Sequence, residues 1–152
     1  MKTLKGALIG CGFFSRNHLL AWHQLKGAEI VALCDVDESR LAGMATDFGI
    51  GQTYNDAKAM FEREKLDFVD IATTVASHRP LVGMAAAAGV PVICQKPFAE
   101  SMDDAIAMVD ACAKAAVPLM VHENFRWQTP IQAVRKLIDK GAIGEPFWGR
   151  FK

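Results

Sequence analysis

The chain has 152 residues, of which 51% are hydrophobic and 22% charged, so its size and composition are those of one globular domain. The 17 basic residues balance the 17 acidic ones, which removes the electrostatic reason to expect a nucleic acid or an anionic membrane as partner. The apolar runs are too short for a membrane span, and the N-terminus lacks the pattern of a signal peptide. These features predict a soluble, cytoplasmic protein.

Short β-rich runs alternate with longer helical patterns over the first 122 residues, which predicts a parallel sheet flanked by helices. We expect strands at residues 6–9, 29–34, 52–54, 67–72, 91–94 and 117–121. We expect helices at residues 15–25, 38–48, 56–63, 78–88 and 101–115. Six strands joined by right-handed crossovers predict a doubly wound, Rossmann-type α/β fold.

Local signals predict several helix ends. Asn55 and Ser77 are the expected N-caps of the helices that follow them. Ser101, with Asp104 three residues later, has the spacing of a capping box. Gly49 is expected to end the helix before it in a left-handed conformation.

The character of the chain changes after residue 122. Residues 123–127 form a polar and aromatic linker, and a helix is expected from residue 129 to about residue 140. Aromatic residues alternate over residues 145–152, as in a new strand. We therefore expect a Rossmann domain at residues 1–122. Residues 123–152 would be the linker, helix and first strand of a second α/β domain whose remainder is missing.

The cysteines have neither CxxC pairing nor metal-ligand spacing with histidine, so no metal site is expected. Three of the four lie in or beside apolar strand-like runs, where cysteine behaves as a small buried hydrophobe. We interpret them as reduced structural thiols: Cys11, Cys34, Cys94 and Cys112.

The glycine-rich turn at residues 10–15, Gly-Cys-Gly-Phe-Phe-Ser, follows the first strand and opens the first helix. It departs from GxGxxG at its third position, but its strand–turn–helix context predicts a dinucleotide site. Gly10 permits the tight turn, and Gly12 lets the backbone approach a pyrophosphate. Ser15 is small enough for close packing of helix on strand. The helix N-terminus then offers N–H groups and a positive dipole to the phosphates.

Asp35 follows the second strand, where a carboxylate can accept hydrogen bonds from the adenosine ribose hydroxyls. With Asp37 and Glu38 it repels a 2′-phosphate. The nearest cation is Arg40. The pattern favours NAD over NADP as the cofactor, and a capping role without a ligand is the alternative for Asp35.

Other polar residues follow the fourth and fifth strands, at the edge where open α/β sheets bind ligands. Thr73 and Thr74 are cofactor candidates, and His78 is either a cofactor or substrate contact or an ordinary surface histidine. Lys96 can hydrogen-bond and polarise the reacting hydroxyl or carbonyl, with a solvated surface lysine as the alternative. For His18, on the first helix, packing is favoured over contact with the phosphate loop.

Together these residues resemble the glucose–fructose oxidoreductase, inositol dehydrogenase and rhizopine-catabolism (Gfo/Idh/MocA) family over the whole chain. The resemblance lies in six ordered motifs: GCGFFS, CDVDESR, ATTVASH, CQKPFAES, ENFRW and GAIGEPFWGRF. It implies a Rossmann domain followed by an α/β domain that carries the substrate site and subunit contacts. A homo-oligomer is therefore expected for a full-length parent.

The resemblance also assigns roles by position. It implies that Gly10, Gly12, Phe13, Phe14 and Ser15 hold the pyrophosphate and Asp35 the ribose. Thr73, Thr74 and His78 would line the nicotinamide side, with Asn124 and Arg126 flanking the cofactor near the domain junction. Lys96 would be the catalytic lysine of the Glu-Lys-Pro motif, and beside it Gln95, also expected at the cofactor, replaces the glutamate. The family's proton-transfer aspartate and histidine would lie beyond residue 152.

We therefore expect the cofactor-binding part of an NAD(P)-dependent oxidoreductase that moves a hydride between nicotinamide and a sugar, polyol or related alcohol. The alternative is a dinucleotide-binding module or sensor without turnover. Reduction of an amino acid or a biliverdin-like substrate is a minor third possibility.

Overall fold

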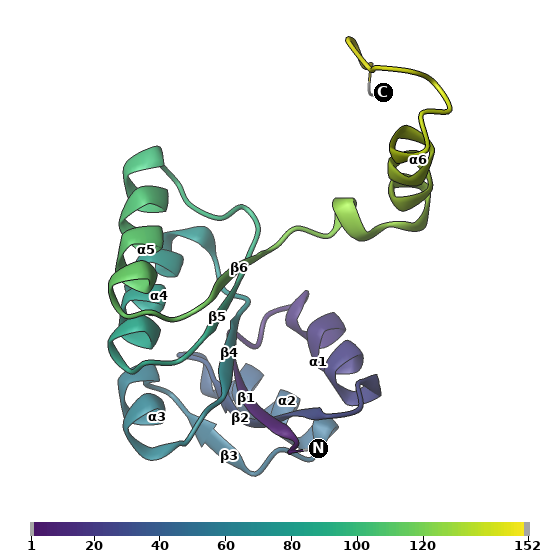
Figure 1. Cartoon of the computed structure of the whole chain (residues 1–152). Helices are drawn as coiled ribbons and strands as arrows, with labels where there is room; N and C mark the ends of the chain where they lie inside the picture. The colour runs from purple at the N-terminus through teal and green to yellow at the C-terminus, as the bar shows by residue number, and fades with distance from the viewer. Residues whose placement is uncertain (1, 151–152) are drawn as a thin grey trace. The chain divides into compact units, whose positions relative to one another are not determined.

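The computed structural model describes residues 2–150. Its centre is a six-stranded, all-parallel sheet with the order β3-β2-β1-β4-β5-β6 (Figure 1). The strands are β1 (Leu4–Ile9), β2 (Ala28–Cys34), β3 (Gln52–Tyr54), β4 (Phe68–Ile71), β5 (Val92–Gln95) and β6 (Leu119–His122). The strand order reverses between β1 and β4, which creates the switch point at which open α/β sheets bind ligands. The predicted doubly wound fold is confirmed.

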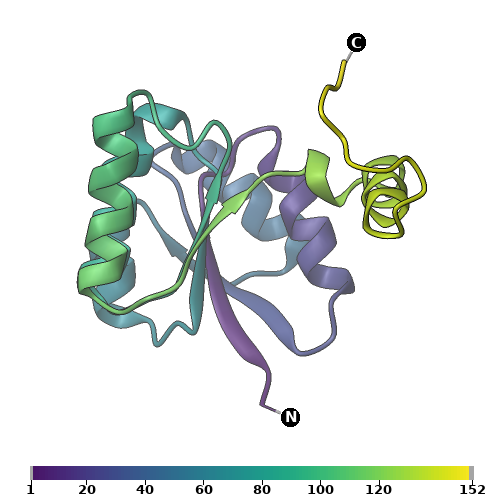
Figure 2. The same cartoon turned by 45° about the horizontal axis from the view of Figure 1, so that its top comes forward.

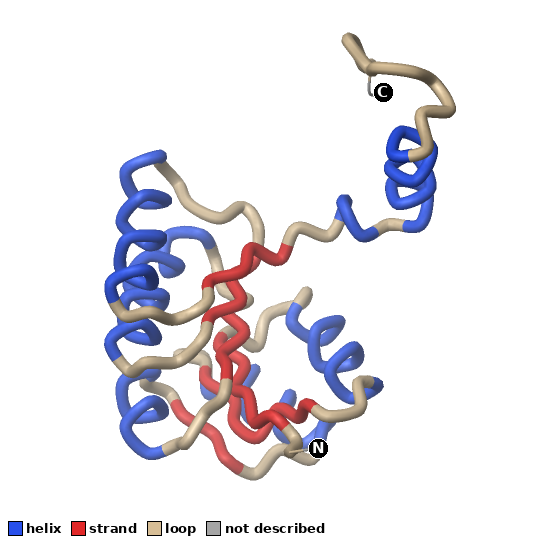
Figure 3. Tube along the Cα trace, viewed as in Figure 1, coloured by secondary structure: helices blue, strands red, loops and turns tan. Residues whose placement is uncertain are grey.

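Helices cover the two faces of the sheet (Figures 1 and 2). One face carries α1 (Ser15–Gln24) and α2 (Glu38–Phe48). The other carries α3 (Ala57–Arg63), α4 (His78–Ala87) and α5 (Met102–Lys114), with the short 3₁₀ helix η1 (Val75–Ser77) before α4. Figure 3 shows the alternation of strands and helices that the sequence predicts. Each observed boundary lies within two residues of the expected one.

The core has two parts because the strands are buried on both faces. Leu8 and Leu33 belong to a smaller cluster together with residues of α1 and α2, such as Leu19 and Leu41. The larger cluster lies on the opposite face and includes strand residues such as Ile71 together with residues of α3, α4 and α5. Neighbouring residues of one strand therefore belong to different clusters, as the two-residue period of a strand requires.

The N-cap of α3 is Asp56 and not Asn55, so that expectation is wrong by one residue. The Asp56 carboxylate accepts hydrogen bonds from the N–H groups of Lys58 and Ala59, both at 3.2 Å. The helix begins at Ala57, so only the side chain at position 56 reaches these two amides. A carboxylate there also interacts favourably with the helix dipole.

Other helix ends agree with their local signals in different degrees. Gly49 ends α2 with φ +67°, and the Ser101 hydroxyl accepts a hydrogen bond from Asp104 N at 3.1 Å at the start of α5. Ser77 occupies the N-cap position of α4, but its side chain makes no cap hydrogen bond. Its hydroxyl instead lies 2.8 Å from the Thr74 carbonyl oxygen, so it stabilises the preceding turn.

Backbone contacts divide the chain into two compact units, Met1–His122 and Glu123–Lys152. The described part of the second unit holds the 3₁₀ helix η2 (Phe125–Trp127) and α6 (Thr129–Asp139).

The expected strand at residues 145–152 is wrong over residues 145–150, which have no strand structure, and residues 151–152 lie outside the described chain. A strand needs a hydrogen-bonded neighbour, and the described part of this unit contains no other strand. Among residues 2–150, no helix is both long enough and apolar enough to cross a bilayer.

Candidate functional site: a glycine turn at the switch point

The glycine turn lies directly after β1, against the end of β4. Gly10 has φ +99°, and a Cβ atom there would lie 2.8 Å from the Ala72 carbonyl oxygen, so no other residue fits without displacing backbone. Ser15 is fully buried, and its hydroxyl lies 3.4 Å from the same carbonyl. A Cβ at Gly12 would meet only open space. The turn is therefore closed toward the sheet and open on its outer side at Gly12.

The N-terminus of α1 continues the open side of the turn. No side chain caps this ten-residue helix, so its first N–H groups have no side-chain acceptor in the described chain. Such a terminus favours an anionic ligand. Phe13 is 95% exposed, while the Phe14 ring is half-exposed and meets His18 edge-on.

Asp35 ties the glycine turn to the end of β2. Its Oδ2 accepts a hydrogen bond from Cys11 N at 2.5 Å, and its Oδ1 accepts one from Asp37 N at 2.8 Å. Each carboxylate oxygen has further lone-pair capacity, so the half-buried group can also accept from a ligand. Arg40 forms an ion pair with the Asp37 carboxylate at 3.1 Å.

The cysteines are all free and buried, which confirms their structural interpretation. Burial raises the pKa of the Cys11 and Cys34 thiols to about 12, and the nearby Asp35 charge adds to the effect. Burial, with the Asp70 charge, likewise raises the pKa of Cys94 to about 12. These thiols therefore remain protonated near neutral pH and are poor nucleophiles.

The segment after β4 carries the predicted threonines. Thr73 is half-buried and Thr74 is exposed, and the Ser77 hydroxyl lies 2.8 Å from Thr73 Oγ1. His78 is 1% exposed, so its interpretation as a surface histidine is wrong. Its Nδ1 lies 3.1 Å from the Phe98 carbonyl oxygen and its Nε2 lies 3.3 Å from that of Thr73. His78 therefore links the segments that follow β4 and β5.

Lys96 follows β5 and its side chain is exposed. Its backbone N–H donates a hydrogen bond to Gln95 Oε1 at 2.8 Å, and the Lys96–Pro97 peptide is cis. β1, β4 and β5 are neighbouring parallel strands, so the glycine turn, Thr73 and Lys96 share one edge of the sheet. The structure thus brings these predicted site residues to the edge expected for a ligand site.

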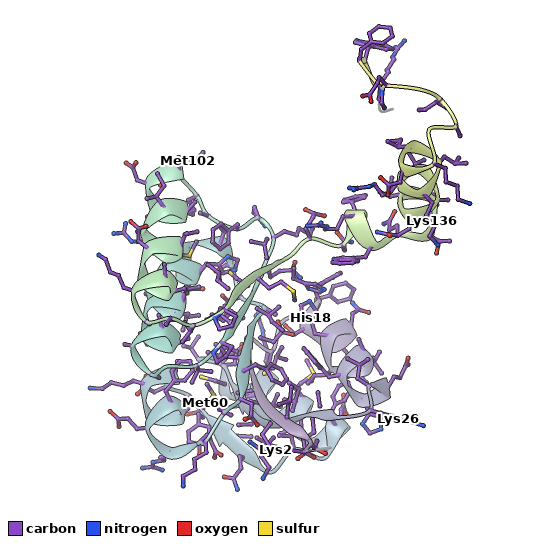
Figure 4. The ribbon with its side chains drawn as sticks, viewed as in Figure 1. Lys2, His18, Lys26, Met60, Met102 and Lys136 are labelled. Atoms are coloured by element: carbon purple, nitrogen blue, oxygen red, sulfur yellow. The ribbon has the colours of Figure 1, made fainter. Side chains whose placement is uncertain are left out.

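A buried polar network beneath this edge was not predicted. His18 projects from α1 toward the sheet (Figure 4), and its Nδ1 lies 2.8 Å from Asp70 Oδ2. Trp22 Nε1 donates to the same oxygen at 2.8 Å, and Gln95 Nε2 lies 2.9 Å from His18 Nε2. The His122 ring stacks edge-on against His18, with 4.5 Å between centroids. An aspartate between the apolar neighbours of β4 was the available signal, because a buried charge needs partners.

Asn124 and Arg126 belong to the second unit and are exposed. The Arg126 guanidinium lies 5.2 Å from the centre of the Trp127 ring, and the Arg126 carbonyl accepts a hydrogen bond from Gln132 Nε2. Their contact with a cofactor remains a prediction.

The parallel sheet, its order reversal and the open glycine turn define a nucleotide-binding domain of the Rossmann class. Comparison with known families identifies the group within that class. The chain belongs to the Gfo/Idh/MocA oxidoreductase family, described as having an NAD-binding Rossmann fold, whose family model matches residues 4–123.

Named relatives agree with this assignment. The chain is 65% identical over 150 residues to a D-apiose dehydrogenase of Paraburkholderia graminis and 64% identical over 151 residues to one of Rhizobium rhizogenes. Each match covers 99% of this chain but only 40% and 44% of those proteins. The chain thus spans about two fifths of the length of these curated relatives.

Solved structures show the same fold. An oxidoreductase from Agrobacterium radiobacter, in complex with NAD+, L-tartaric acid and magnesium, is 62% identical and superposes with a TM-score of 0.95 over 97% of this chain and 43% of its own. The WlbA dehydrogenase from Bordetella pertussis, in complex with NADH and UDP-GlcNAcA, is 30% identical, with a TM-score of 0.89 over 94% of this chain and 44% of its own.

Proposed function

We propose that this chain is the cofactor-binding part of an NAD-dependent dehydrogenase that acts on a sugar, polyol or related alcohol, with D-apiose as the first substrate to test. The observation that carries the proposal is the open glycine turn at the switch point, with Asp35 beside it. The identity of about two thirds to two D-apiose dehydrogenases supports the choice of substrate.

The turn fits a dinucleotide pyrophosphate. Gly12 leaves free the space that a side chain would fill, and the uncapped N-terminus of α1 supplies N–H donors beside it. Gly10 and Ser15 hold the turn against β4, and the exposed Phe13 and Phe14 would flank the phosphates. Gln95 supports the site from below, through the backbone of its neighbour.

The ribose side favours NAD over NADP. The Asp35 carboxylate would accept hydrogen bonds from the two ribose hydroxyls and would repel a 2′-phosphate. Arg40, the nearest cation in the sequence, is already paired with Asp37, so it is less available to a phosphate. The relatives of known structure named above contain NAD+ and NADH.

Hydride chemistry belongs to the opposite end of the cofactor. NAD, when bound, accepts a hydride at its nicotinamide ring from the carbinol carbon of the substrate. Thr73 and Thr74 would line this side, and His78 would hold the Thr73 backbone in place. The Lys96 ammonium would donate a hydrogen bond to the reacting oxygen and stabilise the charge that develops there.

The second unit completes the proposal for the parent enzyme. Residues 123–152 would begin a substrate domain, with Asn124 and Arg126 near the cofactor. We propose a cytoplasmic homo-oligomer for the parent, and the four free thiols are compatible with a reducing compartment.

The experiment has two stages. In the first, NADH and NADPH are titrated into the chain and nucleotide fluorescence is followed; NADH should bind more tightly, and absence of binding by both would refute the cofactor site. In the second, the chain replaces the matched segment of the P. graminis enzyme, and NADH formation is measured with D-apiose and a polyol panel. A non-catalytic dinucleotide sensor, the rival function, would bind NADH without turnover in this chimera.

A further inference from the structure

The buried network beneath Lys96 has only one consistent assignment of its protons. Lys96 N–H is a donor, so its partner 2.8 Å away must be the Gln95 carbonyl oxygen, as placed. The Gln95 amide nitrogen, which can only donate, then faces His18 Nε2 at 2.9 Å. His18 Nε2 must therefore be the unprotonated ring nitrogen. The ring proton lies on Nδ1 and is donated to Asp70 Oδ2.

We propose that Gln95 is a positioning residue that couples the protonation of His18 to the backbone N–H of Lys96. A second ring proton, on His18 Nε2, would face the Gln95 amide hydrogens. Rotation of the amide by half a turn relieves this conflict, because its oxygen then accepts from the ring. The same rotation places the NH₂ group against Lys96 N–H, which loses its acceptor.

The coupling deepens the proposed function and rests on it for its catalytic meaning, because Lys96 is the residue placed at the reacting oxygen. It implies that the Lys96 backbone N–H keeps its hydrogen bond to Gln95 when His18 is neutral and loses that hydrogen bond when His18 is an imidazolium. The groups are well enclosed, since His18 is 3% exposed and Gln95 is 7% exposed.

Side chains from three parts of the domain surround the His18 ring. The Asp70 carboxylate faces the ring from β4, and the His122 ring faces it from β6. From the turn just before α1, the Phe14 ring meets His18 in an edge-on contact. Oδ1 of Asp70 is buried without a hydrogen-bond partner among the described residues, so the negative charge of this carboxylate is only partly compensated.

The first test reads the tautomer directly. ¹⁵N spectra of histidine side chains in the chain without nucleotide, at neutral pH, should show His18 with a protonated Nδ1 and an unprotonated Nε2. In Gln95→Glu a carboxylate can accept from both Lys96 N–H and His18 Nε2–H, so both nitrogens of His18 should become protonated. The exposed Gln52→Glu, with the same charge change, should leave the His18 signals unchanged. A wild-type His18 protonated at Nε2 would overturn the assignment.

The second test reads the coupling. As the pH of the wild-type chain is lowered, the Lys96 amide should lose protection from hydrogen exchange, by about fivefold beyond the intrinsic pH effect, over the range in which His18 gains its second proton. In Gln95→Glu the Lys96 amide should stay protected throughout. If protection of the Lys96 amide does not change over the pH range in which His18 gains its second proton, the proposal is wrong. The wild-type titration remains decisive if the variant fails to fold.

These measurements use no nucleotide, so their outcome is independent of NADH titration. Failure to bind NADH would refute the proposed function and leave the coupling intact. Normal NADH binding together with a constant Lys96 amide would refute the coupling and leave the proposed function intact.

Discussion

Asp35→Ala removes a carboxylate that serves the protein and, by the proposal, the cofactor. In the protein it accepts hydrogen bonds from Cys11 N at 2.5 Å and from Asp37 N at 2.8 Å. At the cofactor it would accept from two ribose hydroxyls. The two roles have different signatures, because loosening the glycine turn affects every dinucleotide, whereas loss of the contact with the 2′-hydroxyl affects NADH alone, since NADPH carries a phosphate at that position.

The contacts set the expected magnitudes. Hydrogen bonds to a charged group contribute about 1.5–3 kcal/mol each, and water can replace part of the two backbone contacts because Asp35 is only half-buried. We therefore expect the free energy of unfolding to fall by about 1.5–3 kcal/mol. The two ribose contacts together contribute about 3 kcal/mol or more to NADH affinity, equivalent to about a hundredfold in Kd. NADPH, which keeps the 3′-hydroxyl, loses the shared contribution from the turn and at most one ribose contact, and it escapes the repulsion between carboxylate and phosphate.

The assay is paired fluorescence titration of NADH and NADPH into wild type and Asp35→Ala, with thermal unfolding of the chain without nucleotide. The preference for NADH should fall by about ten- to a hundredfold, the equivalent of one hydrogen bond to a charged group. Asp110→Ala, at an exposed position on α5, removes an equal charge and should change neither quantity. Equal weakening of the two nucleotides would refute the ribose role and leave Asp35 as a residue that only holds the turn.

Three other outcomes follow from local geometry. Gly10→Ala should destabilise the fold by about 1–3 kcal/mol, because the new Cβ atom meets the Ala72 carbonyl oxygen. Gly12→Ala should leave the melting temperature unchanged and weaken only NADH binding. A similar loss of stability in both variants would contradict this difference. Asp70→Ala leaves His18 Nδ1–H and Trp22 Nε1–H without their acceptor. The free energy of unfolding measured in urea should therefore fall by about 2–6 kcal/mol, at about 1–3 kcal/mol for each donor. An unchanged urea midpoint would contradict the network. The buried thiols of Cys11, Cys34 and Cys94 have pKa values raised to about 12, so they keep protons that the unfolded chain releases from about pH 9. The free energy of unfolding should therefore fall as the pH rises beyond 9, by up to about 1.4 kcal/mol per pH unit for each thiol. An increase in the urea midpoint over this pH range would contradict the sign.

The elements and the site edge could be predicted because their signals are local. Each strand is a short apolar run bounded by turn residues, and a parallel sheet brings all its carboxyl ends to one side. Gly10, Asp35 and Lys96 each come directly after a strand. Their position in sequence therefore fixes the edge at which they lie, without knowledge of any tertiary contact.

The features that could not be predicted depend on distant partners. His78 has the sequence position of a first-turn surface residue, but it is buried, and its ring nitrogens lie beside backbone carbonyl oxygens of two loops. His18 and Asp70 are 52 positions apart, and Gln95 is 77 positions from His18. Periodicity predicts that such positions face inward, but it does not say which polar groups meet there. The strand expected near residue 147 fails for a related reason, because strand structure belongs to a pair of segments and not to one.

The network gives a physical reason for glutamine in place of the glutamate of the Glu-Lys-Pro motif. Asp70 already places one carboxylate beside His18 inside the domain. A glutamate at position 95 would put a second carboxylate on the other ring nitrogen, and burying two acids is costly unless the ring between them carries a second proton and a positive charge. With glutamine, a neutral His18 ring gives each of the three hydrogen bonds from Lys96 N–H to Asp70 one donor and one acceptor, and one negative charge is buried instead of two. The substitution therefore changes the charge of the support beneath Lys96 and keeps its hydrogen bond to the Lys96 backbone.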